Sequence, residues 1–385
     1  MRTRLPRLLV AIVAIAIFAT SCNEGNPNVF VFAKQPYNEV TAGGNWEFLR
    51  DNTESMVVWE PYWDKRLTEY DDVMIYTNAY SIKADPEKDD RSVTNPEWVL
   101  RDANGDPVYI PFDCSNGCPQ FAGDLGNPEY IADWIDDIHD AVARGYQGLY
   151  IDDVNLLWRF GDEFGDDAAP INPRTGNALL LSEWRQYTVE FLEEVRETFP
   201  DLEIWHNSIW YVQTPDFDNG WLRRQVQAAD VIHMERGMND RGITRGTGRF
   251  GMQTYMNFID FVHEQDRQVA LLDTDASSEA EQWFNLAGYF LANDGDDLIS
   301  TEDWDAISPD SWWRGFDVDL GDALTPRIVD GNVIRRYFTG GQVVMNEPLA
   351  DTVTVDLNGS WTDQWGDTVT SVTLGPRDAV VLTPA

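Results

Sequence analysis

Two acidic residues, Asp152 and Asp153, follow a short apolar run in the middle of the chain. The run Gly148-Leu149-Tyr150-Ile151 is typical of a strand that is buried on both faces. In α/β barrels the reacting groups lie at the carboxyl ends of such strands. A carboxylate in this position can serve as an acid, a base or a nucleophile.

Four further predicted strands also end on polar or ionisable residues. The ends of all barrel strands surround one mouth, so residues that are far apart in sequence would converge there. A single aspartate after a strand is usually a helix cap or a solvated acid, so it is the convergence that indicates a site. The four pairs are His206 and Asn207, Glu235 and Arg236, Asp273 and Asp275, and Glu302 and Asp303.

Two opposed carboxylates suit glycoside hydrolysis. One carboxylic acid protonates the leaving oxygen, and the other carboxylate attacks the anomeric carbon or activates water. Asp152 and Glu235 are the predicted catalytic pair. Strand alternation should turn Asp153 toward the barrel wall or let it cap the following loop. Arg236 or His233 could tune the proton affinity of Glu235, and a structural salt bridge with Arg236 is the alternative role for that carboxylate.

Tryptophans in the predicted loops after strands indicate a carbohydrate ligand, because sugar C–H faces pack on aromatic rings. Filling the core under a long loop is the alternative role for each of them. Together with the polar strand ends, they complete the predicted substrate-binding set: Trp63, Trp158, Trp210, Asp153, His206, Asn207, Asp273 and Glu302.

Helices and strands alternate through the second half of the chain. Asn127-Pro128 predicts a helix start, and Gly145 ends the apolar stripe that follows it. Further helices are expected at 184–199, 252–261 and 278–292, between strands at 148–151, 202–206, 231–234, 269–272 and 297–300. This order predicts parallel strands joined by right-handed crossovers. Upstream, segments 29–33, 56–59, 73–77 and 108–111 are four candidates for the three strands still needed.

After about residue 325 the pattern changes to short strands separated by Gly, Pro, Asn and Asp, which predicts a small antiparallel β domain. Its position after a barrel resembles the C-terminal β-sandwich of many glycoside hydrolases. The predicted fold is thus α/β, with a (β/α)8 barrel over 29–325 and a β-sandwich domain over 326–385. Within the barrel, Asn104-Gly105 indicates a hairpin turn, and Asp102 and Asp106 lack the other ligands of a calcium loop.

The N-terminus has the pattern of a secretory signal over residues 1–21, with a basic start and an apolar stretch too short for a membrane span. Cys22 resembles the lipidated cysteine of bacterial lipoproteins, with an ordinary cleaved signal as the alternative, and residues 22–28 form a polar tether. We therefore expect an extracellular or cell-surface protein that contacts the membrane only through a lipid at Cys22. Cys114 and Cys118 predict a local disulfide, since a zinc site would need further soft ligands.

The chain is strongly acidic, with a formal charge of −38 at pH 7. Residues 1–21 hold three arginines and no acid, so the mature charge is −38 − 3 = −41. Phosphate binding requires concentrated Lys and Arg, which excludes a nucleic-acid partner. The composition resembles that of halophilic proteins, whose acidic surface is screened by salt. A cationic substrate, such as an amino-sugar polymer, is the alternative explanation, and no cofactor is expected.

Three segments carry a family resemblance over residues 70–325. They are Asn95-Pro96-Glu97-Trp98 through Asp106-Pro107, Asp124-Leu125-Gly126-Asn127-Pro128-Glu129-Tyr130, and Gly148 to Asn155. They resemble the glycoside hydrolase barrels of unassigned specificity and, more distantly, the secreted α-1,4-polygalactosaminidase barrels. Clan-D type α-glycosidases place the nucleophile after the fourth strand and the acid/base after the sixth. The resemblance thus implies that Asp152 is the nucleophile and Glu235 the acid/base, although that clan has Asp where this chain has Glu235.

The leading hypothesis is therefore a secreted retaining α-glycosidase that acts on an oligo- or polysaccharide. The alternative is a non-catalytic glycan-binding surface lipoprotein on the same scaffold. A third hypothesis, a metal-dependent hydrolase, would use His206, His233 and Asp152. It requires adjacent strands to point both histidines inward, and the chain has no HxH or HExxH spacing.

Overall fold

The computed structural model describes residues 24–34, 36–40, 46–70, 72–208, 220–274, 276–300 and 312–385. Several residues singled out in the sequence lie outside these ranges: the segment 1–21, Cys22, Trp210, Asp275, Glu302 and Asp303. Among the helices that the structure describes, none combines the length and apolar character that crossing a membrane requires.

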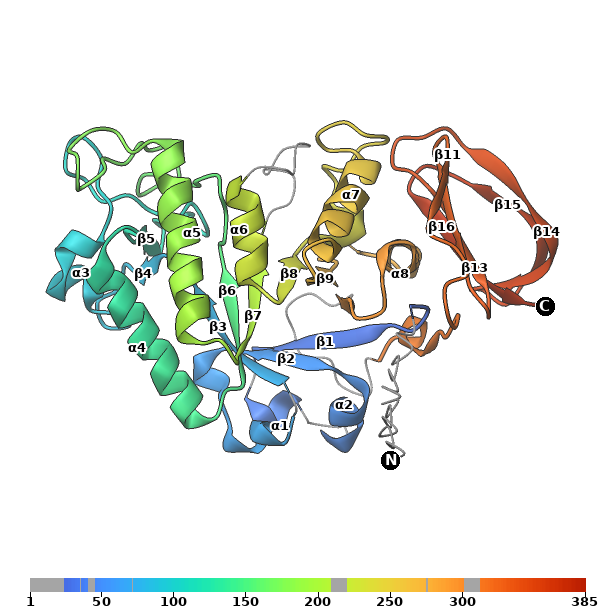
Figure 1. Ribbon diagram of the computed structural model, residues 1–385, viewed down its shortest axis with the longest axis horizontal. Helices are drawn as coiled ribbons and strands as arrows, with labels where there is room; N and C mark the ends of the chain where they lie inside the picture. Colours follow the sequence, from blue (N-terminus) through green and yellow to red (C-terminus); the bar gives the residue numbers. More distant parts are fainter. Residues whose placement is uncertain are drawn as a thin grey trace, which may run out of the picture.

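Eight parallel strands close into a barrel at the centre of the molecule (Figure 1). The barrel prediction is confirmed, and the first three upstream candidates supply the first three strands. The fourth candidate, 108–111, lies outside the barrel, where Tyr109 bridges to Phe121 and Gly161. In chain order the barrel strands are β1 (Asn28–Ala33), β2 (Ser55–Val58), β3 (Asp72–Asn78), β6 (Gly148–Asp152), β7 (Glu203–Asn207), β8 (Val231–Met234), β9 (Gln268–Leu272) and β10 (Leu298–Ser300).

The helices lie around the barrel and confirm the predicted alternation. The Asn127 side chain caps the first long helix, and Gly145 ends it in a left-handed conformation with φ of 116°. The described helices of this layer are α1 (Tyr37–Val40), α2 (Trp46–Asn52), α4 (Pro128–Arg144), α5 (Leu181–Thr198), α6 (Gly220–Ala228), α7 (Met252–His263) and α8 (Glu279–Ala292).

A long insertion between β3 and β6 extends one side of the barrel. It contains β4 (Ser81–Lys83) and β5 (Gln120–Ala122), which pair with each other, and the short helices α3 (Arg91–Thr94) and η3 (Pro96–Trp98). The turn at Asn104-Gly105 is a hairpin turn, closed by hydrogen bonds between Asp102 and Asp106. A disulfide joins Cys114 to Cys118 in this insertion.

The barrel is filled by side chains from alternate strand positions. The inner cluster contains Phe30, Phe32, Val57, Met74, Tyr150, Trp205, Val231, Ala270, Leu272 and Leu298. The intervening residues, such as Leu149, Ile151 and Ile204, face the helices and join the larger outer core. Strand alternation therefore determines which strand-end residues face the mouth.

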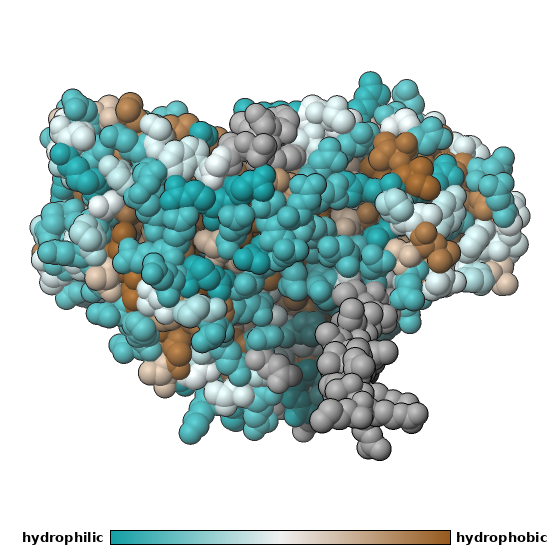
Figure 2. Space-filling model, viewed as in Figure 1, coloured by the Kyte–Doolittle hydropathy of each residue, from teal (hydrophilic) through white to brown (hydrophobic). Residues whose placement is uncertain are grey.

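Beyond the barrel, a six-stranded antiparallel sheet has the order β11-β12-β13-β16-β14-β15. It encloses its own apolar cluster, which includes Val344, Leu357 and Leu374, and β12, β13 and β16 contact α8 (Figure 1). Hydrophilic residues cover most of the face shown in Figure 2. The strands are β11 (Ile328–Asp330), β12 (Val333–Tyr337), β13 (Gln342–Asn346), β14 (Val353–Asp363), β15 (Thr368–Leu374) and β16 (Asp378–Pro384).

Candidate active site

Three polar residues face the barrel mouth because each lies two positions after an inward-facing residue. Asp152 follows Tyr150 on β6, and Asn207 follows Trp205 on β7. Glu235 directly follows β8 and lies four positions after Val231, which faces inward, so the two residues point to the same side of the strand. The period of two along a strand thus brings residues 83 positions apart to one place.

The Asn207 side chain bridges the two predicted catalytic carboxylates. Its Nδ2 donates to Oδ1 of Asp152 at 2.8 Å and to Oε2 of Glu235 at 3.1 Å. These two oxygens can be no farther apart than the sum of 2.8 Å and 3.1 Å, which is 5.9 Å. The structure therefore places Asp152 and Glu235 at one site, with these two oxygens closer together than the roughly 6.5 Å at which the range for inverting pairs begins.

Asp152 receives two further hydrogen bonds. The hydroxyl of Tyr76 donates to Oδ2, and the backbone N–H of Asp153 donates to Oδ1 at 2.7 Å. Tyr76 lies on β3 and faces the barrel interior, so strand alternation could have identified it once the strand was placed. Three donors hold this carboxylate in one orientation.

Asp153 does not turn away as strand alternation predicts. Its φ of 59° is left-handed, so the chain leaves the strand direction, and its carboxylate accepts a hydrogen bond from Nδ2 of Asn78 at 2.7 Å. Arg159 lies 4.0 Å away. Burial, followed by the neighbouring charge of Asp152, raises the pKa of Asp153 to about 7. The mouth therefore contains a third carboxyl group close to Asp152, rather than a scaffold residue on the wall.

Glu235 is half-buried, and its environment favours the protonated form. Burial raises the pKa of Glu235, the charge of Asp152 adds to this, and the hydrogen bond from Asn207 opposes it. Arg236 is exposed and pairs with Asp240, whose carboxylate lies 3.9 Å from the guanidinium. Glu235 therefore has the character of a proton donor, while Asp152 is held by three donors.

Directly below the carboxylates lies His233, which is fully buried in the barrel. Its Nδ1 lies 3.2 Å from Oδ1 of Asn207 and 2.9 Å from the hydroxyl of Tyr150. Burial lowers the pKa of His233 to about 3, so the ring is neutral at physiological pH. The sequence indicated a tuning role toward Glu235, whereas the structure connects this histidine to Asn207.

His206 does not face the barrel mouth, where a substrate-binding role would place it. It alternates with the inward-facing Trp205 and Asn207, so its ring faces the helices and is fully buried. Burial also lowers its pKa to about 3. The set His206, His233 and Asp152 that a metal-dependent hydrolase would need is therefore not assembled, because the two histidines lie on opposite sides of the barrel wall.

Asp273 follows β9 but is also buried, with 1% of its surface exposed. Its carboxylate accepts a hydrogen bond from Asn239 in η5 (Gly237–Asn239), the turn that follows Glu235. Gly237 packs so closely that an added Cβ would lie 3.0 Å from the carbonyl oxygen of Leu272. Asp273 is thus buried against the loop that follows Glu235, and its contact with substrate stays a prediction.

The structure describes two of the three tryptophans predicted to bind substrate, and the two lie in different places. Trp63 packs on Tyr146, with ring centroids 4.0 Å apart, just before the amino end of β6 and therefore away from the mouth. Trp158 is half-buried in the loop after β6, 5.8 Å from Phe160. The aromatic ring that the sequence analysis missed is Trp59, which stacks on Tyr76 at 4.2 Å. Its position two residues after the inward-facing Val57 was the available signal.

The chain was compared with protein families, curated proteins and solved structures. The model of the family described as hypothetical glycosyl hydrolase family 15 matches residues 61–342. No curated protein matches the chain. The glycoside hydrolase domain of PelA from Pseudomonas aeruginosa is 14% identical, covering 73% of this chain and 97% of that domain, with a TM-score of 0.45.

Two further solved structures share the fold. An α-amylase from Lactobacillus plantarum is 13% identical, covering 94% of this chain and 99% of that one, with a TM-score of 0.50. The α-galactosidase TtGalA from Thermus thermophilus is 15% identical, covering 81% and 65%, with a TM-score of 0.50. At such identities the likeness concerns the fold alone. The family match extends over most of the barrel, including Asp152, Asn207 and Glu235, and this chain belongs to hypothetical glycosyl hydrolase family 15.

Proposed function

We propose that this protein is a retaining α-glycosidase in which Asp152 is the nucleophile and Glu235 the general acid/base. The observation that carries the proposal is the double hydrogen bond from Asn207, which holds the two carboxylates within 2.8 Å and 3.1 Å of one nitrogen. Retaining enzymes keep their carboxyl groups about 5–5.5 Å apart, and inverting enzymes about 6.5–9.5 Å apart. The upper limit of 5.9 Å set by those two bonds supports the retaining arrangement.

The two carboxylates have environments that suit different roles. Asp152 has three donors on its oxygens and is oriented for attack on an anomeric carbon. Glu235 has a pKa raised by burial and accepts a hydrogen bond from Asn207, which suits a group that must hold a proton at the start of the reaction. Such a difference between neighbouring carboxyl groups supports Glu235 as the acid and Asp152 as the nucleophile.

The reaction would proceed in two steps. Asp152 attacks the anomeric carbon while the proton of Glu235 passes to the glycosidic oxygen, so that the C–O bond breaks and a glycosyl ester of Asp152 forms. Glu235, now a carboxylate, then takes a proton from water, whose oxygen attacks the same carbon and releases Asp152. Two inversions at one carbon leave its configuration retained.

The choice of an α-linked substrate rests on the position of the two carboxylates after the fourth and sixth barrel strands. Trp59 is half-buried and stacks on Tyr76, whose hydroxyl donates to Asp152, so Trp59 is the aromatic ring that we expect a sugar beside Asp152 to contact. The signal-like segment 1–21 and Cys22 support secretion and attachment at the cell surface.

A hydrolysis screen over α- and β-linked oligo- and polysaccharides at high salt tests the proposal. The wild type is compared with Asp152→Asn and with Asp140→Asn, an exposed control on α4 that loses the same charge. We expect Asp152→Asn to abolish turnover without a large change in melting temperature, and Asp140→Asn to behave as wild type. Undiminished activity of Asp152→Asn would refute the assignment, and an inverted product anomer would refute the retaining mechanism.

Glu235→Gln gives a second, independent test. On a substrate whose leaving group needs no protonation, this variant should form the glycosyl ester and accumulate it, since the base for its hydrolysis is missing. Exogenous azide should restore turnover and yield a glycosyl azide of retained configuration. Glycan binding by a wild type that hydrolyses none of the substrates would favour the non-catalytic surface lipoprotein instead.

A further inference from the structure

An exposed tryptophan, Trp365, lies at the tip of the hairpin between β14 and β15. Oδ1 of Asp363 closes this turn, because it accepts hydrogen bonds from the backbone N–H groups of Trp365 and Asp367, both at 2.9 Å. The side chain of Gln364 bonds to the main chain of β16 at 3.1 Å and 3.2 Å. The indole is therefore carried on a fixed turn, with 49% of the residue exposed.

Trp365 contacts the barrel beside α8. Its ring centroid lies 6.5 Å from that of Trp283, a buried residue of α8. The guanidinium of Arg314 lies 5.4 Å from the centroid of Trp283 and 5.6 Å from that of Trp365, as in cation–π contacts. Glu279 holds this guanidinium, since its Oε1 accepts from Nε at 2.8 Å and from Nη2 at 2.6 Å. Trp365, Arg314 and Glu279 thus form one surface, which we call the tryptophan ledge.

The two charged residues of the tryptophan ledge keep hydrogen-bonding capacity for a ligand. Both contacts of Arg314 with Glu279 go to the same oxygen, Oε1. Within the part of the chain that the structure describes, Oε2 of Glu279 and Nη1 of Arg314 make no hydrogen bond. The two side chains are 44% and 54% exposed. Neighbouring hydroxyl groups of a sugar can accept from the guanidinium and donate to the carboxylate, while its C–H face packs on the indole.

The tryptophan ledge is electrically neutral, although the chain carries a formal charge of −38. The charges of Arg314 and Glu279 cancel, and Trp365 has none. A cationic ligand would be attracted by carboxylates all over such a protein, and an anionic ligand would be repelled. The neutral ledge therefore suits a neutral ligand that has both an apolar face and hydroxyl groups, which is the chemistry of a neutral sugar.

The tryptophan ledge lies at the end of α8 nearest the barrel mouth. Glu279 is the first residue of α8, which begins after the mouth end of β9 and runs back along the barrel. Arg241, in the loop that follows Glu235, pairs with Glu281 in the same first turn at 2.6 Å. The ledge and the loop that follows Glu235 are therefore neighbours along the start of α8.

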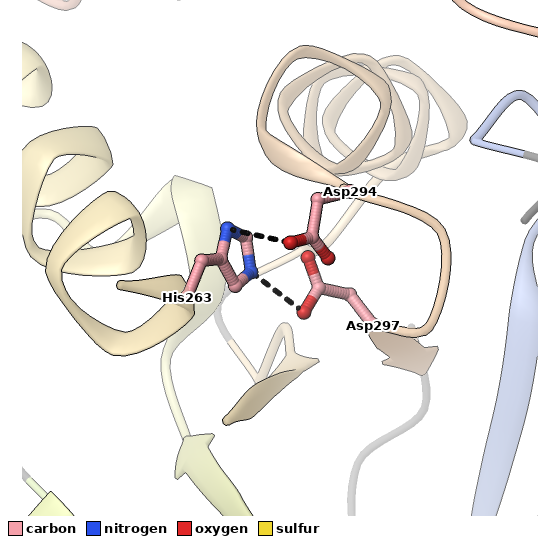
Figure 3. A group of neighbouring side chains, drawn as sticks. All are labelled: His263, Asp294 and Asp297. Carbon is pink, nitrogen blue, oxygen red and sulfur yellow. Dashed lines mark hydrogen bonds and ion pairs between the residues drawn. The ribbon is translucent and has the colours of Figure 1, made fainter. Parts of the chain in front are cut away.

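The opposite end of α8 is fixed both to the barrel and to the C-terminal domain. His263 at the end of α7, Asp294 after α8 and Asp297 before β10 form a cluster there (Figure 3). Nε2 of His263 lies 2.9 Å from Oδ1 of Asp297, and Nδ1 lies 3.7 Å from Oδ2 of Asp294. Arg336 of β12 donates to two carbonyl oxygens at this end of α8, at 3.0 Å and 2.5 Å. The ledge is thus mounted on a helix that is held at both ends.

We propose that the tryptophan ledge is a second carbohydrate-binding site, which takes a neutral polysaccharide beside the barrel mouth. One sugar unit packs its C–H face on Trp365, and its hydroxyl groups bond to Nη1 of Arg314 and Oε2 of Glu279. Membership of a glycosyl hydrolase family makes a polysaccharide the expected ligand class. Binding at the ledge does not depend on hydrolysis, whereas its role in holding the chain for cleavage at Asp152 rests on the proposed function.

Affinity electrophoresis in native gels that contain soluble starch, dextran or galactomannan tests the proposal. Every protein carries Asp152→Asn, so that the polysaccharide stays intact during the run. The test variant is Trp365→Ala, and the matched control is Phe164→Ala, which removes a ring that is 70% exposed at the tip of a similar turn closed by Asp162. We expect at least one polysaccharide to retard the parent protein, with a dissociation constant about tenfold higher in Trp365→Ala and unchanged in Phe164→Ala.

Two checks separate the loss of binding from the loss of folding. Trp365→Tyr keeps an aromatic ring on the turn and should bind more tightly than Trp365→Ala. In the parent protein, the polysaccharide should slow the oxidation of Trp365 by N-bromosuccinimide severalfold, as located by peptide mass spectrometry. Trp361 is the internal control and should oxidise at an unchanged rate, because it is half-buried four positions away and its Nε1 donates to the carbonyl oxygen of Leu357 at 3.1 Å.

The proposal is overturned if none of the three polysaccharides retards the parent protein, or if Trp365→Ala is retarded as strongly as the parent. Equal losses in Trp365→Ala and Phe164→Ala, or oxidation of Trp365 that no polysaccharide slows, would also overturn it. The ledge would then be a structural contact between the two domains. None of these measurements requires turnover, so their outcome is distinct from that of the hydrolysis screen.

Discussion

Oδ1 of Asn207 lies 3.2 Å from Nδ1 of His233, one layer below the carboxylates of Asp152 and Glu235. The amide nitrogen of Asn207 donates to Asp152 and Glu235, so its oxygen is turned toward the ring and accepts from it in the tautomer that carries the proton on Nδ1. The hydroxyl of Tyr150 lies 2.9 Å from the same ring nitrogen. Burial keeps the ring neutral by lowering the pKa of His233 to about 3. The buried histidine thus determines which way the bridging amide faces.

Replacing Asn207 with leucine should damage catalysis more than folding. The variant loses the donor to both carboxylates, and the removal of one such preorganised donor commonly lowers kcat by about 10²- to 10³-fold. The hydrogen bond from Asn207 lowers the pKa of Glu235, so its loss should also move the basic limb of the kcat/KM profile to higher pH. A full pH–rate profile measures both effects. An unshifted basic limb would show that Asn207 does not control the acid.

Replacing His233 with phenylalanine tests the contact between His233 and Asn207. The phenyl ring keeps the packing against Phe30 and Phe32, whose centroids both lie 5.7 Å from the imidazole ring, but removes the donor to Asn207. We expect a similar shift of the basic limb to higher pH, with a smaller loss of kcat than in Asn207→Leu. Normal kinetics in this variant would mean that the amide keeps its orientation without the histidine.

Asp153 should make stability depend on pH around neutrality. Its folded pKa is raised to about 7 from an ordinary value of 3.8, so its contribution to stability is complete below pH 3.8 and is lost as pH rises through 7. Asp153→Asn should therefore be more stable than wild type at pH 8, by on the order of 1–4 kcal/mol, and nearly equal to it at pH 4. Denaturant unfolding at both pH values measures this, with Asp140→Asn as control. A constant difference between the two pH values would contradict the raised pKa.

Much of the fold could be predicted because each element carries a local signal. Asn127-Pro128 and Gly145 mark the two ends of α4, and the apolar run at Gly148 marks β6. Asp152 and Glu235 could be located for the same reason, since both follow short buried strands. The extra candidate at 108–111 could not be excluded, because an apolar run has the same composition in a barrel as in an insertion.

The sequence alone could not show in which direction several side chains near the site point. His206 and Asn207 are adjacent, and only the register of β7 shows that His206 faces the helices while Asn207 faces Asp152. Asp153 departs from alternation because of its left-handed φ of 59°, a tertiary feature with no local sequence mark. Asp273 is covered by η5, and no pattern in the sequence indicates that contact.

The contrast between Trp59 and Trp63 can be tested by truncating each to alanine. Trp59 stacks on Tyr76, which contacts Asp152, so Trp59→Ala should raise KM by about tenfold or more through the loss of a sugar platform. Trp63 packs on Tyr146 away from the mouth, so Trp63→Ala should lower the melting temperature and leave KM unchanged. A raised KM for Trp63→Ala, with an unchanged KM for Trp59→Ala, would instead support Trp63 as a substrate-binding residue.

The C-terminal sheet reaches the loop that begins at Glu235. The guanidinium of Arg377 donates to the carbonyl oxygens of Met238 at 3.2 Å and Ile243 at 3.1 Å. The buried carboxylate of Glu347 accepts from the N–H of Gly246 and from Nε2 of Gln253, both at 2.7 Å. The loop from Glu235 to α7 is therefore held on one side by Asp273 and on the other by the C-terminal domain.

For this reason we expect Arg377→Met to lower kcat by about tenfold. The residue does not contact the carboxylates, but a small misplacement of a catalytic group lowers the reaction rate strongly. Cleavage by protease within 238–251 should accelerate, since the backbone there loses two of its anchors. Arg245→Met, in the same loop but exposed, is the matched control and should behave as wild type. Arg377→Lys, which retains the charge and one donor, should fall between the two. If Arg377→Met melts earlier but keeps the wild-type kcat and pH profile, the C-terminal domain contributes stability alone, and Glu235 is positioned by the barrel.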